Sequence, residues 1–253
     1  YRLTKRLGAG GMGEVYLAEH QLLKRPCAVK LIRGAQTNDA QAIARFEREV
    51  RSMARLSHWN SVEVFDYGCA EDGTFYYAME YLPGLNLQEV VERQGPMQPE
   101  RVVHLLRQVC QALAEAHGMG LVHRDIKPSN IIAAARGGLC DVAKILDFGL
   151  ATMVDDALEV QLSRDGVVAG SPYYLAPERI LEDSPPDARS DIYSLGAVAY
   201  FLVCGRPPFR GDKPISVMIA HARDPLVPPS QVNPSVPADL EQIPIDEAMA
   251  RLK

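Results

Sequence analysis

The first part of the chain alternates apolar and polar residues over short stretches, a pattern that predicts β-strands. Three such stretches, L-T-K-R-L-G, E-V-Y-L-A-E and P-C-A-V-K-L-I, come first, and two more lie around 62–67 and 75–80. Between them, apolar residues from Ile43 to Met53 recur at three- and four-residue spacing, which predicts a helix over about 39–56. We therefore expect a small β-rich half that carries one helix.

The rest of the chain has mostly helical spacing after a break at Leu82-Pro83-Gly84. An apolar face over 100–117 predicts a long amphipathic helix, and the apolar run from Ser194 to Cys204 predicts a buried one. Short strand-like pieces lie around 130–133 and 143–146. Prolines then become frequent, which predicts a tail rich in loops.

Composition and charge narrow the function classes. A hydrophobic fraction of 47% is that of an ordinary globular protein. A net charge of −5 argues against a nucleic-acid-binding role. The longest apolar run covers only about half of the roughly 20 residues that a membrane span needs, so no membrane contact is expected within this chain.

The cysteines and the start of the chain bear on its location. Five scattered cysteines without a C-x-x-C pair predict reduced thiols rather than disulfides or a zinc site, and hence a cytoplasmic protein. Because the chain starts at Tyr1, we expect it to be a fragment. The full-length protein could then be tethered to a membrane through segments outside it.

A glycine-rich motif lies between the first two predicted strands: Gly8-Ala9-Gly10-Gly11-Met12-Gly13-Glu14-Val15. Glycines let a backbone approach a polyphosphate closely. A glycine-rich hairpin without a ligand is the alternative for the motif alone. The strand that follows it disfavours a dinucleotide site, whose loop opens a helix, and the G-K-[ST] signature of P-loop NTPases is absent.

Lys30 ends an apolar strand, where its ammonium either reaches solvent or needs a buried partner. Glu49 lies on the predicted helix one turn before Met53 and can face the sheet, so we expect it to pair with Lys30.

A dense polar motif, His123-Arg124-Asp125-Ile126-Lys127-Pro128-Ser129-Asn130, follows the long helix. A solvated loop is the alternative for any single charged residue in it. The complete H-R-D-x-K-x-x-N string is followed, however, by Asp147-Phe148-Gly149 and then by Ala176-Pro177-Glu178.

In this order the motifs resemble those of the eukaryotic-type (Hanks-type) protein kinases, most closely the bacterial serine/threonine kinases. The resemblance covers nearly the whole chain. It implies an α+β fold with two lobes in one kinase domain over 1–253, a β-rich N-lobe over 1–81 and a mainly helical C-lobe over 82–253 that is incomplete at its C-terminus.

The resemblance also implies roles for the polar residues. Lys30 would hold the ATP phosphates and be fixed by Glu49, and Asn130 and Asp147 would bind Mg²⁺, with Mn²⁺ as an alternative metal. Asp125 would accept the proton of the substrate hydroxyl and Lys127 would stabilise the transferring phosphoryl group, as in the serine/threonine class. The implied ATP-binding residues comprise the loop, the adenine pocket and the hinge: Gly8, Ala9, Gly10, Gly11, Met12, Gly13, Val15, Ala28, Lys30, Met79, Glu80, Leu82 and Ile132.

Regulation is expected in the polar segment between the Asp-Phe-Gly and Ala-Pro-Glu motifs. A phosphate there could order it by pairing with Arg124. Candidate sites are Thr152 and Ser163, whereas Ser171 matches a substrate-positioning residue of the family. Asp191 matches the buried family residue that tethers the catalytic loop, and a helix N-cap is its alternative.

Two departures from the family pattern stand out. Trp59 occupies the place of proline in the usual H-P-N turn, so that turn is expected to differ. The chain also ends before the family's last helices, so Glu178 is expected to lack its arginine partner, at a cost of roughly 3–5 kcal/mol for a broken buried pair.

These observations favour an active ATP-dependent kinase that acts on Ser and Thr of proteins and is regulated by autophosphorylation, with a homodimer considered for autophosphorylation in trans. A catalytically inactive nucleotide-binding signalling module is the alternative, favoured by the missing tail. A small-molecule phosphotransferase is disfavoured by Lys127 and by the Ala-Pro-Glu motif.

Overall fold

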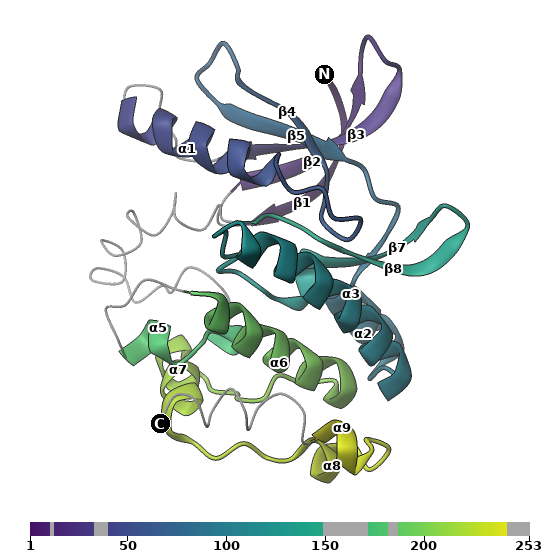
Figure 1. The fold of residues 1–253 in the computed structure, drawn as a ribbon, viewed down its shortest axis with the longest axis vertical. Coiled ribbons are helices and arrows are strands. Elements are labelled where there is room, and N and C mark those ends of the chain that lie inside the picture. The colour runs from purple at the N-terminus through teal and green to yellow at the C-terminus, as the bar shows by residue number, and fades with distance from the viewer. Residues whose placement is uncertain (11–12, 33–39, 149–171, 182–186, 242–253) are drawn as a thin grey trace.

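The computed structural model of the chain describes residues 1–10, 13–32, 40–148, 172–181 and 187–241. It is mixed α and β, with a large sheet and one helix formed by the N-terminal part and helices predominating after residue 86 (Figure 1). The predicted α+β class is confirmed.

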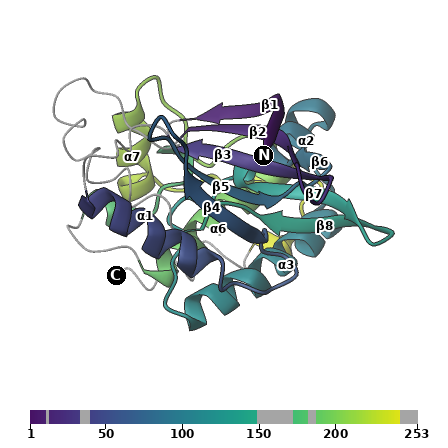
Figure 2. The same cartoon turned by 90° about the horizontal axis from the view of Figure 1, so that it is seen from above.

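The N-terminal part is an antiparallel sheet with the strand order β1-β2-β3-β5-β4. Its strands are β1 (Arg2–Gly10), β2 (Gly13–His20), β3 (Arg25–Ile32), β4 (Val64–Cys69) and β5 (Phe75–Glu80). Helix α1 (Ala40–Met53) lies beside the sheet, as Figure 2 shows from above. The rings of Phe46 and Phe75 pack 4.9 Å apart between helix and sheet. All five predicted strands and the predicted helix are confirmed.

The C-terminal part combines helices with a small antiparallel sheet in the order β6-β7-β8. The strands are β6 (Gly84–Asn86), β7 (Ile131–Arg136) and β8 (Leu139–Ile145). The helices are α2 (Leu87–Gln94), α3 (Pro99–Gly118), α5 (Glu178–Leu181), α6 (Ala188–Cys204), α7 (Pro214–Arg223), α8 (Pro229–Val232) and α9 (Ala238–Glu241), with 3-10 turns η1 (Pro128–Asn130) and η2 (Pro172–Tyr174).

Local sequence explains where the helices begin and end. Helix α2 starts with a capping box, in which Asn86 and Glu89 bond each other's backbone N–H. Helix α6 is capped by Asp187 and ends at Gly205, whose φ of 71° suits glycine. Within the described residues, no helix is long and apolar enough to cross a membrane.

Two expectations need correction, and one helix was not expected. Helix α6 begins at Ala188 rather than at Ser194, because its polar first turn is buried and tied to other elements. Helix α2 was not predicted. The proline-rich tail is not only loop, since α7 and α8 each start with a proline, whose fixed φ suits the first turn of a helix.

The two parts share one hydrophobic core. Buried side chains from the sheet and α1, such as Phe46 and Met79, belong to the same apolar cluster as Leu87, Phe148 and Val198 from the later elements. The core therefore continues across the junction between the two parts, where the polar motifs also meet.

Candidate active site

The loop of the H-R-D motif is fixed by a buried carboxylate. Asp191 on α6 accepts hydrogen bonds of 2.8 Å from the backbone N–H groups of His123 and Arg124, and it lies 2.8 Å from Nε2 of His117. Its side chain is 1% exposed. The predicted tethering role is confirmed, and Asp187 rather than Asp191 is the helix cap.

Three polar side chains of this motif contact one another. Nζ of Lys127 donates to Oδ2 of Asp125 at 2.6 Å, and Nδ2 of Asn130 donates to the same oxygen at 3.1 Å and to the Asp125 carbonyl at 2.8 Å. Oδ1 of Asp125 accepts none of the hydrogen bonds found among the described residues, which leaves this oxygen for a further donor. The sequence-predicted Asp125, Lys127 and Asn130 are thus brought together.

Asp147 joins this cluster through the backbone. The N–H of Leu146 donates to the Asn130 carbonyl at 2.9 Å, which places the next residue, Asp147, beside the loop. Asp147 has a φ of 59°, a left-handed conformation that a non-glycine residue rarely adopts. Such backbone outliers concentrate at functional sites.

Lys30 of β3 pairs with the carboxylate of Asp147. Its Nζ lies 2.6 Å from Oδ2 of Asp147, and the lysine is 5% exposed. The expected partner was Glu49, but among the ion pairs of the described residues Lys30 pairs with Asp147 instead. Glu49 is half-buried on α1 and has an interaction of its own.

Tyr77 completes the surroundings of Asp147, and the sequence analysis missed it. Its hydroxyl donates to Oδ1 of Asp147. Burial raises the pKa of Tyr77 well above its ordinary value, and Asp147 raises it further, so the phenol stays protonated. Burial alone would raise the pKa of Asp147, but Lys30 and the Tyr77 hydroxyl outweigh it and hold that pKa below its usual range.

The apolar residues of the expected ATP site can also be located. The side chains expected to enclose adenine, Val15, Ala28 and Ile132, belong to or pack against one hydrophobic cluster, which also contains Met79 of the expected back pocket and Leu82 of the expected hinge. Val15 and Ala28 come from neighbouring strands of the large sheet, whereas Ile132 comes from β7 of the small one. The cluster therefore presents apolar side chains from both sheets, as a flat aromatic base needs.

Glu80, the last residue of β5, connects the end of the large sheet to residues of the C-terminal part. Its carboxylate accepts hydrogen bonds from the Glu63 N–H at 3.0 Å and from Nζ of Lys144 at 2.6 Å, and it also pairs with Arg136. The Arg136 guanidinium lies 4.5 Å from the ring centroid of Trp59. Trp59, which departs from the H-P-N pattern, thus stacks on a cation bound to the connecting segment.

Described glycines of the glycine-rich motif lie at the facing ends of β1 and β2, where Gly10 pairs with Gly13. Gly13 has a φ of 145°, and a Cβ built on it would lie 1.8 Å from the carbonyl oxygen of Leu31. Only glycine fits there. Gly8 and Gly10 lie at the end of β1, where a methyl group added to either would meet no described residue within 4 Å, so their open faces leave room for a ligand.

Comparison with known proteins identifies this arrangement. The family model described as "Protein kinase domain" matches residues 1–243. The chain belongs to the protein kinase family. It is 39% identical over 235 residues to the serine/threonine-protein kinase pkn3 of Myxococcus xanthus, covering 92% of this chain and 43% of that protein. It is 40% identical over 246 residues to the serine/threonine-protein kinase PknB of Mycobacterium tuberculosis, and the match covers 96% of this chain and 38% of that protein.

The fold agrees with solved kinase structures. The PknI kinase domain of Mycobacterium tuberculosis superposes with a TM-score of 0.68 at 28% identity, covering 92% of this chain and 80% of that one. The chain spans only about two fifths of the length of the curated kinases that it matches.

Several expected residues of the kinase domain lie outside the described residues. They are Gly11, Met12 and Gly149 of the motifs, and Thr152, Ser163 and Ser171 of the activation segment. Arg124, the expected phosphate partner, has a buried Nε that makes no hydrogen bond within the described part of the chain.

The expected absence of an arginine partner for Glu178 concerns a tail, 242–253, that lies outside the described residues. One oxygen accepts a 2.6 Å hydrogen bond from the Ser190 hydroxyl, while the other is buried without a hydrogen-bond partner among the described residues. The pairing of Glu178 in this part of the chain is therefore with a neutral group rather than a cation.

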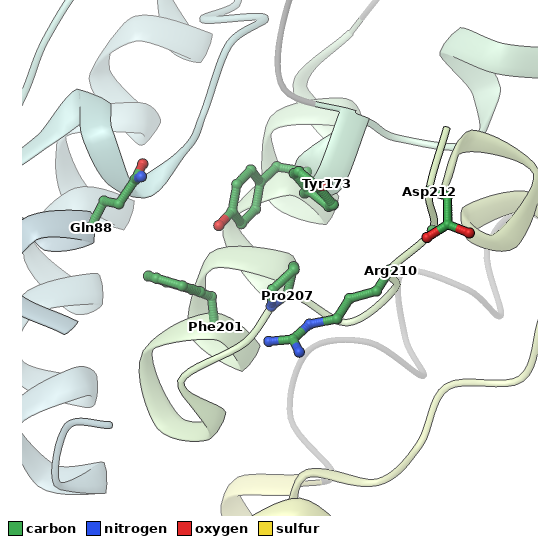
Figure 3. A pocket seen from close by; sticks show the side chains of 8 residues that line it. Gln88, Tyr173, Phe201, Pro207, Arg210 and Asp212 are labelled. Atoms are coloured by element: carbon green, nitrogen blue, oxygen red, sulfur yellow. The ribbon is translucent and has the colours of Figure 1, made fainter. Parts of the chain in front are cut away.

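A cavity of about 660 Å³ lies in the C-terminal part of the kinase domain (Figure 3). It is lined from α2, η2, α6 and the loop before α7 by Gln88, Tyr173, Tyr174, Phe201, Pro207, Arg210, Gly211 and Asp212. Tyr173 and Tyr174 directly precede Leu175 and the Ala-Pro-Glu motif, so the described end of the segment between the two motifs lines the cavity. Sequence reasoning missed it, because its lining residues are scattered along the chain.

Proposed function

We propose that this kinase domain transfers the γ-phosphoryl group of ATP to Ser and Thr hydroxyls of proteins. The observation that carries the proposal is the Asp125 carboxylate, one oxygen of which is held by Lys127 and Asn130 while the other is left to accept a bond. A base fixed in this way can orient an incoming hydroxyl and take its proton. The kinase names of its relatives agree with this activity.

The donor set fits a magnesium ion. Asn130 donates through Nδ2 to Asp125, which leaves its Oδ1 for a cation, and Asp147 offers a carboxylate nearby. Such hard oxygen ligands suit Mg²⁺ and also Mn²⁺. The metal would neutralise charge on the ATP phosphates. Asn130 and Asp147 would hold it, and Lys30 would hold the phosphates beside it.

The remaining assignments follow the two parts of the chain. We place the N-lobe at 1–81 and the C-lobe at 82–253 of one kinase domain, with ATP between them. The glycine-rich hairpin would cover the phosphates, and backbone groups of Glu80 and Leu82 would bind adenine. Glu49 would pair with Lys30 once nucleotide phosphates draw that lysine away from Asp147.

The cavity of Figure 3 supports a protein substrate rather than a small molecule. A segment of polypeptide would lie across Tyr173, Phe201 and Arg210, which line this cavity. A second copy of the chain is one such substrate, with Ser163 and Thr152 as acceptors and Arg124 as the cation that binds the product phosphate.

The test is a radiolabelled ATP–Mg²⁺ autophosphorylation assay, with a generic basic protein as a second acceptor and Asp125→Asn as the matched control. We expect label on Ser or Thr that the control abolishes. Mass spectrometry then locates the acceptor residues. A chain that melts cooperatively and gains stability with ATP but never incorporates label would instead be a nucleotide-binding signalling module.

A further inference from the structure

The contact between Tyr77 and Asp147 is not explained by the roles proposed so far. Tyr77 lies in β5 and its side chain is fully buried. Its hydroxyl donates a hydrogen bond to Oδ1 of Asp147, and Nζ of Lys30 donates one to Oδ2 at 2.6 Å. Nζ of Lys30 also lies 5.9 Å from the centroid of the Tyr77 ring, so the three side chains converge at one point.

A hydroxyl at this position has a cost that a phenylalanine would avoid. Alternating residues of β5, namely Phe75, Tyr77 and Met79, are buried in the same apolar core. A buried hydroxyl loses free energy unless it is hydrogen-bonded. Among the hydrogen bonds of the described residues, Asp147 is the partner of the Tyr77 hydroxyl. Any effect of this hydroxyl on the proposed site therefore acts through Asp147.

We propose that Tyr77 is a positioning residue for the metal-binding carboxylate of this kinase. Its hydroxyl still holds Oδ1 of the Asp147 carboxylate when Lys30 has turned to the nucleotide phosphates, and it leaves the other lone pairs of that group directed at the metal. The inference rests on the proposed function, because it assigns Asp147 to the metal of ATP–Mg²⁺.

Geometry supports an orienting role. A carboxylate has about four lone-pair sites, so two donors leave room for a cation. Asp147 has a strained φ of 59°. The two side chains that donate hydrogen bonds to its carboxylate, Lys30 and Tyr77, lie on β3 and β5 of the large sheet. The proposed metal ligands themselves lie outside that sheet. Removing such an outer partner of a metal ligand typically weakens metal binding about 10–100-fold.

Two other roles for Tyr77 predict different outcomes. If its ring only fills the core, loss of the hydroxyl leaves the metal dependence unchanged. If its hydroxyl competes with the metal for Oδ1, loss of the hydroxyl makes the metal bind more tightly.

The test compares Tyr77→Phe with Tyr76→Phe. Tyr76 is the preceding residue of β5, packs in a different apolar cluster and uses its hydroxyl in no hydrogen bond found among the described residues. Binding of a non-hydrolysable ATP analogue is followed by titration calorimetry over a series of Mg²⁺ concentrations. For Tyr77→Phe we expect the Mg²⁺ concentration at half-maximal binding to rise about 10-fold or more, with Tyr76→Phe equal to wild type.

An unchanged or lower Mg²⁺ requirement in Tyr77→Phe would overturn the proposal. Tyr77→Met serves as a second variant without a hydroxyl, and the same rise is expected. Loss of a cooperative melt in both variants would also overturn it, because the hydroxyl would then serve folding. If wild-type binding shows no Mg²⁺ dependence, the proposed function fails first and the positioning role falls with it.

Discussion

Asp191 holds Arg124 in a left-handed backbone conformation. Its Oδ1 accepts a 2.8 Å hydrogen bond from the N–H of Arg124, whose φ is 70°. A non-glycine residue in this region costs of order 1–3 kcal/mol, which the surroundings must offset. Because Asp125 follows directly, the same hydrogen bond that offsets the strain also aims the expected base.

Replacing Asp191 should therefore be far more costly than replacing another carboxylate of the same helix. Asp191→Ala removes two charge-assisted backbone hydrogen bonds and should lower the free energy of unfolding by about 3–5 kcal/mol. Asp187→Ala removes only a half-exposed helix cap, worth about 1 kcal/mol. Urea unfolding measures both, and equal losses would contradict the tethering role.

The two ends of the glycine-rich hairpin should respond oppositely to alanine. Gly13→Ala places a methyl group against the Leu31 carbonyl and should destabilise the chain by about 1–3 kcal/mol, as overpacking does. Gly8→Ala meets open space and should leave stability unchanged or raise it by up to about 1 kcal/mol. Thermal melting of both variants is the measurement. Similar shifts for the two would show that the hairpin relaxes around Gly13.

Trp59 should be energetically coupled to Arg136. The guanidinium lies over a ring that is half-exposed, where a cation–π contact contributes about 0.5–1 kcal/mol. A double-mutant cycle with Trp59→Leu and Arg136→Met, measured by urea unfolding, should give a coupling energy of about that size. A coupling of zero would mean that the stacked geometry adds nothing to stability.

His221 should make the kinase domain acid-sensitive. The side chain is fully buried beside Tyr193, and burial lowers its pKa to about 4 from an ordinary 6.5. Between these values the unfolded chain binds the proton and the folded chain does not, so stability falls as pH falls from about 6.5 to 4. The full loss from this group is about 3 kcal/mol.

The matched variant for that pH effect is His221→Phe. It leaves the Tyr193 hydroxyl without its partner, so it should be less stable than wild type at pH 7. Its deficit should shrink as the pH is lowered to about 4, because phenylalanine takes up no proton. Denaturant unfolding at several pH values tests this, and two parallel stability curves would rule out His221 as the source.

The strands and the long helices could be predicted because their signals are local. Alternation in β5 and apolar spacing in α3 depend on residues a few positions apart. The motif residues Asp125, Lys127 and Asn130 could also be placed together, since they share one short loop. Helix α7 was missed because frequent prolines predict loops, whereas here a proline starts the helix.

Contacts between distant segments could not be read from the sequence. Nothing local indicates that Lys30 pairs with Asp147 rather than with Glu49 on the nearer helix. Tyr77 lies in an alternating run of aromatic and apolar residues, so its pattern predicts only burial, and its hydroxyl partner follows 70 residues later. Trp59 was recognised as a departure, but its cationic neighbour lies on β7.

The bonds to Glu80 have a mechanical consequence. They bind the end of β5 to Arg136 of β7 and Lys144 of β8 on the side away from the glycine-rich hairpin. A structure fastened along one edge opens by rotation about that edge. Any rotation of the large sheet relative to the C-terminal part is therefore expected to displace Glu80 least and β1, the edge strand beyond β2 and β3, most.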